Sequence, residues 1–124
     1  PAANYKIGNL YFRNDRLRKP LTKIKLVKIK KDMGWCNDVR NSKYNKLCKV
    51  NKNIKHEKLY RKDHKYDFLI PIKYNFYKPI PGKGSCIFIH ITKDYKPTAG
   101  CIALNKNDFL ILLKLIDKNT QIRI

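Results

Sequence analysis

Apolar residues and lysines alternate almost perfectly along residues 21–30 (LTKIKLVKIK). This two-residue period predicts a half-buried strand with one face in water. Residues 5–12 (YKIGNLYF) predict another strand, bent at Gly8 because a glycine inside a strand often marks a bend. Residues 85–91 (SCIFIHI) are apolar on both faces, so we expect a central strand that is covered on both sides.

The last third of the chain contains the clearest helical pattern. Asn105 can cap a helix whose buried side is formed by residues 109–116, and Asp108 completes a weak capping box. We expect Asn119 to take the left-handed position at the C-terminal end of this helix. Residues 121–124 predict a last strand.

Two further segments have weaker patterns. Residues 66–72 (YDFLIPI) predict a strand whose Pro71 indicates a sheet edge or a bulge, because proline cannot donate a ladder hydrogen bond. Residues 31–65 show no sustained period, and we expect a long loop region there with one short helix near residues 54–60. The pattern as a whole predicts a mostly β fold with one or two helices.

Length and hydropathy limit the chain to one small domain. Its 124 residues, 43% of them apolar, can build a single modest core. No apolar run reaches the roughly 18 residues of a membrane span, so we expect no transmembrane segment. Residues 1–5 have neither the basic start nor the apolar stretch of a secretory signal.

The chain is strongly basic, with a formal net charge of +20. Such a surplus is typical of proteins that bind nucleic acid, an acidic membrane surface or an anionic polymer. Here 23 of the 29 basic residues are lysines spread along the chain, whereas base and phosphate recognition relies mainly on arginine. We therefore expect a solvated basic surface and no nucleic-acid partner, and attraction to an anionic polymer stays open.

The four cysteines, at positions 36, 48, 86 and 101, form no CxxC pair, and the three histidines complete no zinc-ligand spacing. We therefore expect no metal site. A disulfide between Cys36 and Cys48 stays open. Cys86 lies within the predicted strand 85–91, on the same face as His90, and core packing is its expected role.

His90 and Cys101 are the strongest chemical candidates. His90 ends the predicted buried strand, and Cys101 follows Gly100 eleven residues later. A glycine before a nucleophile permits a tight turn that lets backbone N–H groups face a reacting carbonyl. An imidazole that takes the thiol proton makes cysteine a strong nucleophile, so the pair fits acyl transfer. The spacing alone also allows a cysteine and a histidine that only pack in the core.

The residues around this pair are more specific than its spacing. Residues 84–90 (GSCIFIH) and 97–104 (PTAGCIAL) resemble the signature of YkuD-type L,D-transpeptidase catalytic domains, in the branch that writes P-T-A-G-C-[IV]-A-L. Further matching pieces are residues 1–8, 32–38, 44–45, 56–61, 66–67 and 107–108. The resemblance implies that residues 1–124 are one such catalytic domain, truncated at its N-terminus and lacking one or more strands. It also implies a β-sandwich or barrel-like mixed sheet.

The resemblance further implies a cysteine acyl transfer on peptidoglycan stem peptides without a metal or cofactor. Cys101 would be the nucleophile and His90 its base, with backbone N–H groups near Gly100 and Cys101 facing the oxyanion. A backbone carbonyl or Asp94 would fix the tautomer of His90. The bond attacked would join the diamino acid of a tetrapeptide stem to its terminal D-Ala.

Four more residues are candidates for substrate contact or for support of the His–Cys pair: Trp35, Asp38, His56 and Thr98. Glu57 is a weaker candidate. Loop packing is the competing interpretation for the residues of the 31–65 region. The resemblance places the protein in the periplasm or cell envelope, and the oligomeric state is unknown.

Three possibilities stay open at this point. The first is an enzyme: an amine acceptor would give 3→3 cross-links, and water would make the same site an L,D-carboxypeptidase. The second function is a non-catalytic basic module that binds nucleic acid or an anionic wall polymer, with an affinity that falls steeply with salt. The third is a retained fold without activity.

Overall fold

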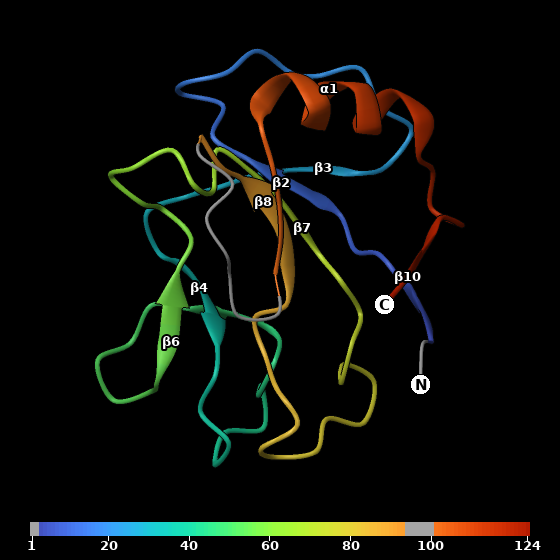
Figure 1. Ribbon diagram of the computed structural model, residues 1–124. Helices are drawn as coiled ribbons and strands as arrows, with labels where there is room; N and C mark the ends of the chain where they lie inside the picture. The colour runs from blue at the N-terminus through green and yellow to red at the C-terminus, as the bar shows by residue number, and fades with distance from the viewer. Residues whose placement is uncertain (1–2, 94–100) are drawn as a thin grey trace.

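Figure 1 shows the computed structural model of the protein, which describes residues 3–93 and 101–124. The elements are β1 (Asn4–Lys6), β2 (Leu10–Phe12), β3 (Leu26–Lys28), β4 (Met33–Cys36), β5 (Leu47–Lys49), β6 (His56–Lys58), β7 (Phe68–Pro71), β8 (Phe88–Ile91), β9 (Ile102–Leu104), α1 (Lys106–Leu115) and β10 (Gln121–Arg123). The mostly β fold with mixed sheets is confirmed, with one helix among the described residues.

The central sheet has five strands in the order β3-β2-β7-β8-β9. Its two outer pairs, β2–β3 and β8–β9, are parallel, and its inner pairs are antiparallel. Helix α1 lies across one face of this sheet, while β4 and β6 lie toward the other (Figure 1). A separate three-stranded antiparallel sheet has the order β5-β4-β6, and β1 pairs with β10 near the chain ends.

Alternation along the central strands sends side chains into two cores. The helix-side core contains Ile7, Leu10, Phe12, Ile24, Phe68, Ile70, Ile72, Ile89, Ile91, Phe109, Leu113 and Ile116. The inter-sheet core contains Tyr11, Ile29, Trp35, Leu59, Tyr66, Leu69 and Phe88. Successive residues of β8 therefore face opposite ways, with Phe88 and His90 toward the three-stranded sheet and Ile89 and Ile91 toward the helix.

Burial on both faces explains why the central strands are so apolar. All four residues of β7 and of β8 are buried. Each large apolar side chain buried in this way contributes about 1.5–3 kcal/mol. The expectation of a covered central strand near His90 is thus confirmed.

The expectation of a long loop with a short helix near residues 54–60 is wrong, because residues 33–58 form the three-stranded sheet. Its strands are only three or four residues long, and lysines occupy several outward positions, so no period is visible in the sequence. Gly34 permits the close pairing of these strands, since a Cβ there would lie 3.1 Å from His56 Cδ2.

Helix α1 begins as expected. The Asn105 side chain accepts a hydrogen bond of 2.8 Å from the Asp108 amide, which confirms the cap. The expected left-handed Asn119 is wrong, because the helix stops at Leu115 and its C-cap, Ile116, is extended. Ile116 instead fills the helix-side core, and this burial turns the chain away from the helix axis.

Other strands are shorter than the pattern indicated. Of residues 21–30 only β3 is a strand. Residues 5–12 do not form one strand bent at Gly8, because β1 and β2 are separate strands in different sheets. Pro71 ends β7, which lies inside the sheet between β2 and β8 and so is not at an edge. Strand β9 was not expected, because Ile102–Leu104 has too few residues to show a period.

No helix in the described ranges is long and apolar enough to span a membrane.

Candidate active site

His90 is buried on the inter-sheet face of β8, with only 2% of its surface exposed. Its Nδ1 lies 2.9 Å from the backbone carbonyl oxygen of Ile91. A carbonyl only accepts, so Nδ1 carries the proton and Nε2 keeps its lone pair. Nε2 is buried and has no hydrogen-bond partner within the described part of the chain. Burial lowers the pKa of His90, so the imidazole is a neutral base.

Cys101 directly precedes β9, which runs parallel to β8 with Ile102 opposite Ile89. This register puts Cys101 beside Phe88, and the side chains of Cys101 and Phe88 contact the same inter-sheet core. The thiol donates a hydrogen bond of 3.3 Å to the Cys86 carbonyl oxygen. Burial raises the pKa of Cys101, and the Phe88 amide and the charge of Lys65 partly oppose this rise.

Tyr66 and Glu57 come from other segments and complete this cluster. The ring of Tyr66 packs edge-on against His90, with centroids 6.0 Å apart. Its hydroxyl donates a hydrogen bond to Glu57 Oε1. Burial, followed by this bond to Glu57, raises the pKa of Tyr66, so the phenol stays protonated and remains a donor. Neither residue was among the stronger candidates from the sequence.

Cys86 lies just before β8 and not in it, contrary to the expectation of a mid-strand residue. Its φ of 57° puts it in the left-handed region that non-glycine residues seldom adopt. Its amide donates a 3.2 Å hydrogen bond to Asn45 Oδ1, and its side chain packs against the inter-sheet core. Burial and the charge of Glu57 raise the pKa of Cys86 to about 12, so it is a neutral thiol.

Trp35 lies on the same side as the His90–Cys101 pair but is a core residue. It is 4% exposed, and its indole donates a 2.9 Å hydrogen bond to Asn45 Oδ1. Its ring meets Phe88 edge-on, with centroids 5.4 Å apart. The structure therefore gives Trp35 a supporting position beneath the site.

Asp38 and His56 are directed elsewhere. Asp38 accepts hydrogen bonds from Arg40 and the Lys55 amide, and the bond from the Arg40 side chain is the main reason that the pKa of Asp38 falls to about 2. His56 Nδ1 lies 2.8 Å from the Ile54 carbonyl. Strand alternation in β6 puts His56 and Glu57 on opposite faces, with Glu57 on the inner one.

Three further expectations, for Asp94, Thr98 and Gly100, concern residues outside those that the structure describes. Cys36 and Cys48 are separate thiols, so the disulfide that the sequence left open between them is not formed. Within residues 3–93 and 101–124, no group of three or more His, Cys, Asp or Glu side chains is arranged to hold a metal ion.

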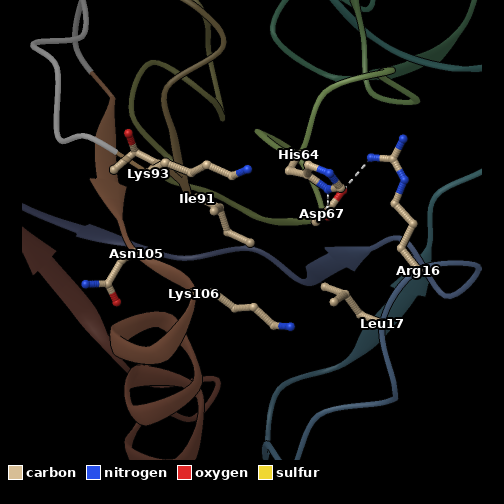
Figure 2. Close-up of a pocket in the computed structure, with 9 residues that line it drawn as sticks. Arg16, Leu17, His64, Asp67, Ile91, Lys93, Asn105 and Lys106 are labelled. Atoms are coloured by element: carbon tan, nitrogen blue, oxygen red, sulfur yellow. Dashed lines mark hydrogen bonds and ion pairs between the residues drawn. The ribbon is translucent and has the colours of Figure 1, made fainter.

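A hollow of about 570 Å³ lies at another place, where β8 ends and α1 begins (Figure 2). On its wall Asp67 binds both Arg16 and His64, at 2.8 and 2.7 Å. Ile91 lines this hollow and faces the helix side, whereas His90 faces the inter-sheet core. The hollow is therefore separate from the His90–Cys101 pair, since neither residue lines it.

Comparison with protein families matches the whole of residues 1–124 to the YkuD L,D-transpeptidase catalytic domain. This cluster of thiol, imidazole and phenol between two sheets thus belongs to a member of the YkuD family, an enzyme family that acts on peptidoglycan, typically in the cell envelope. No curated protein and no solved structure matches the chain.

The sequence contains only a partial signal for Glu57 and Tyr66, which were not among the stronger candidates. Residues 56–61 and 66–67, which contain Glu57 and Tyr66, resemble the family. The strand register that turns Glu57 inward, opposite Trp35, could not be read from three residues.

Proposed function

We propose that this protein is a cysteine acyltransferase that cleaves the bond between the diamino acid and D-Ala of tetrapeptide stems and forms 3→3 cross-links. One observation carries the proposal. Nδ1 of His90 is hydrogen-bonded to a carbonyl, while the basic Nε2 is buried and has no partner within the described residues. His90 is on β8, the strand that pairs with the strand directly after Cys101. A buried polar nitrogen without a partner is costly, which favours a role in proton transfer.

The first half of the reaction forms a thioester. His90 Nε2 takes the thiol proton as Cys101 Sγ attacks the stem carbonyl, and backbone N–H groups near Gly100 and Cys101 stabilise the oxyanion. His90 then gives this proton to the departing D-Ala amine. The C–N bond breaks and the Cys101 thioester remains.

The second half releases the acyl group. An amine of a neighbouring stem attacks the thioester carbonyl, and Cys101 recovers a proton through His90. Water in place of the amine would give an L,D-carboxypeptidase.

The two pKa directions indicate how the nucleophile is activated. Burial raises the pKa of Cys101 and lowers that of His90, so the resting pair is neutral. A neutral pair requires proton transfer during attack, in contrast to a preformed thiolate–imidazolium pair. Lys65 favours the thiolate as it forms, since its charge lowers the pKa of Cys101.

The test is release of D-Ala from disaccharide tetrapeptides, with mass spectrometry of the protein after exposure to a carbapenem. The wild type should release D-Ala and gain the mass of one adduct at Cys101, and C101A should do neither. C48S is the matched control, because Cys48 is a free thiol on the three-stranded sheet. Salt-sensitive binding to an anionic polymer with no D-Ala release and no adduct would replace the proposal with the non-catalytic alternative.

A further inference from the structure

Glu57 differs from the four carboxylates of this basic chain that pair with an arginine. Asp15, Asp38, Asp63 and Asp67 each bind an arginine, at 2.8, 3.2, 2.7 and 2.8 Å. Among the described residues, Glu57 forms no ion pair, although the chain has 29 basic residues. A partly buried carboxylate without a counter-ion is costly, so a ligand that brings a cation would be stabilised there.

The position of Glu57 is fixed from two sides. Its strand β6 pairs with β4 so that Glu57 is opposite Trp35, on the face toward the central sheet. The Tyr66 hydroxyl holds one carboxylate oxygen, and the same Tyr66 ring packs against His90. A single phenol thus connects the carboxylate to the imidazole.

The negative charge of Glu57 also acts on both thiols and the imidazole of the cluster. It raises the pKa of Cys86, Cys101 and His90. Glu57 and Cys101 are both partly exposed, so neither residue is closed off from solvent.

The basic groups nearby are turned to other partners. Arg61 binds Asp63 and lies 5.3 Å from the centre of the Tyr66 ring. Lys65 Nζ lies at the same distance from that ring. Neither is within ion-pair distance of Glu57, so the charge of the carboxylate is not neutralised by direct contact with them.

We propose that Glu57, held by the Tyr66 hydroxyl, is the binding site for an ammonium group of the ligand that reaches Cys101. Building on the proposed acyl transfer, this ammonium is the side-chain amine of the acceptor stem. A carboxylate–ammonium pair is a charge-assisted hydrogen bond, which fixes the nitrogen beside the thioester.

Two protons leave the acceptor nitrogen during the transfer step. The bound ammonium loses one proton through Glu57 to water and becomes the free amine. Its nitrogen attacks the thioester carbonyl, and its second proton passes through His90 to the departing Cys101 sulfur. The products are an amide, the free thiol and one proton in solution.

Binding to the C101A protein tests the site without any catalysis. The probes are Nα-acetyl-lysine amide and Nα-acetyl-norleucine amide, which differ in the ammonium group, with binding followed by NMR titration. We expect the lysine probe to bind at least tenfold more tightly. Adding E57Q should abolish this preference, and E57D should retain part of it because the charge remains but is drawn back. D117N is the matched control, since Asp117 is a partly exposed carboxylate that follows the C-cap of α1.

A catalytic measurement then separates this inference from the proposed function. In the protein that retains Cys101, E57Q should form the acyl-enzyme but shift its breakdown tenfold or more from aminolysis toward hydrolysis. Circular dichroism checks that the variants are folded. Equal binding of the two probes, or an unchanged preference in folded E57Q and E57D, would overturn the ammonium site. Absence of an acyl-enzyme in the wild type would overturn the proposed function, while the binding result would still decide the role of Glu57.

Discussion

Asn45 connects the two sheets beneath the candidate site, and its replacement by alanine gives the sharpest stability prediction. Its side chain accepts from Trp35 Nε1 at 2.9 Å and from the Cys86 amide at 3.2 Å. It donates to the carbonyls of Tyr74 and Asn75 at 3.0 and 2.8 Å. Asn45 is 3% exposed and has a φ of 59°.

The expected loss follows from these contacts. Four hydrogen bonds at a net ~1 kcal/mol each give about 4 kcal/mol, and the bonds are lost as one network. Alanine adds about 1 kcal/mol for a left-handed conformation that asparagine tolerates better. N45A should therefore lower the free energy of unfolding by about 4–5 kcal/mol, a large part of the 5–15 kcal/mol typical of a domain.

Two companion variants and one control extend this test. N45G removes the same bonds without the conformational cost, so it should be about 1 kcal/mol more stable than N45A. N45D turns a buried carboxylate oxygen toward the carbonyl oxygens of Tyr74 and Asn75, which repel it, so N45D should be at least as unstable as N45A. N53A is the control, because Asn53 is exposed, and it should change stability by less than about 0.5 kcal/mol.

The assay is urea unfolding followed by both Trp35 fluorescence and far-UV circular dichroism, since Trp35 is the single tryptophan. Coincident transitions would show that the two sheets unfold together. A loss below about 1 kcal/mol for N45A would refute the argument that this side chain joins them.

Three further predictions use the same structure. Burial raises the pKa of Cys101 above the usual thiol value of 9.0. In a mass-spectrometric pH series, alkylation of Cys101 by iodoacetamide should therefore have its midpoint above pH 9.0. A midpoint near pH 7 would instead indicate a preformed thiolate–imidazolium pair. Hydrogen bonds from Arg13, Arg40 and Arg61 lower the pKa values of Asp15, Asp38 and Asp63 from the usual 3.8 to about 2. The contribution of these carboxylates to stability should thus be complete above pH 4 and lost as the pH falls through 2. A urea midpoint unchanged from pH 5 to pH 2 would contradict this. F109A should cost about 3–5 kcal/mol because Phe109 is fully buried and stacked on Phe68 at 5.3 Å, whereas I111A, at a site 57% exposed, should cost far less; equal losses in urea unfolding would show that α1 packs differently.

Strong local periods and one specific motif are what the sequence alone determined. The covered strand around His90 and the capped helix after Asn105 were predictable, because the residues that form them also carry the pattern. The motif at residues 97–104 indicates the family by its residues alone, and it contains Cys101, which is expected to act with His90. That pair stays a prediction until the labelling experiment is done.

The tertiary structure decided what depends on pairing between distant segments. The sheet formed by β4, β5 and β6 was not visible in the sequence, because strands of three or four residues have too few positions for a period. Their register is set by pairing with other strands. The same register turns Glu57 inward and His56 outward. Glu57 is therefore the stronger candidate for substrate contact, although the sequence had favoured His56. Tyr66 joins His90 to Glu57 only because two sheets pack face to face, and no local pattern contains that contact.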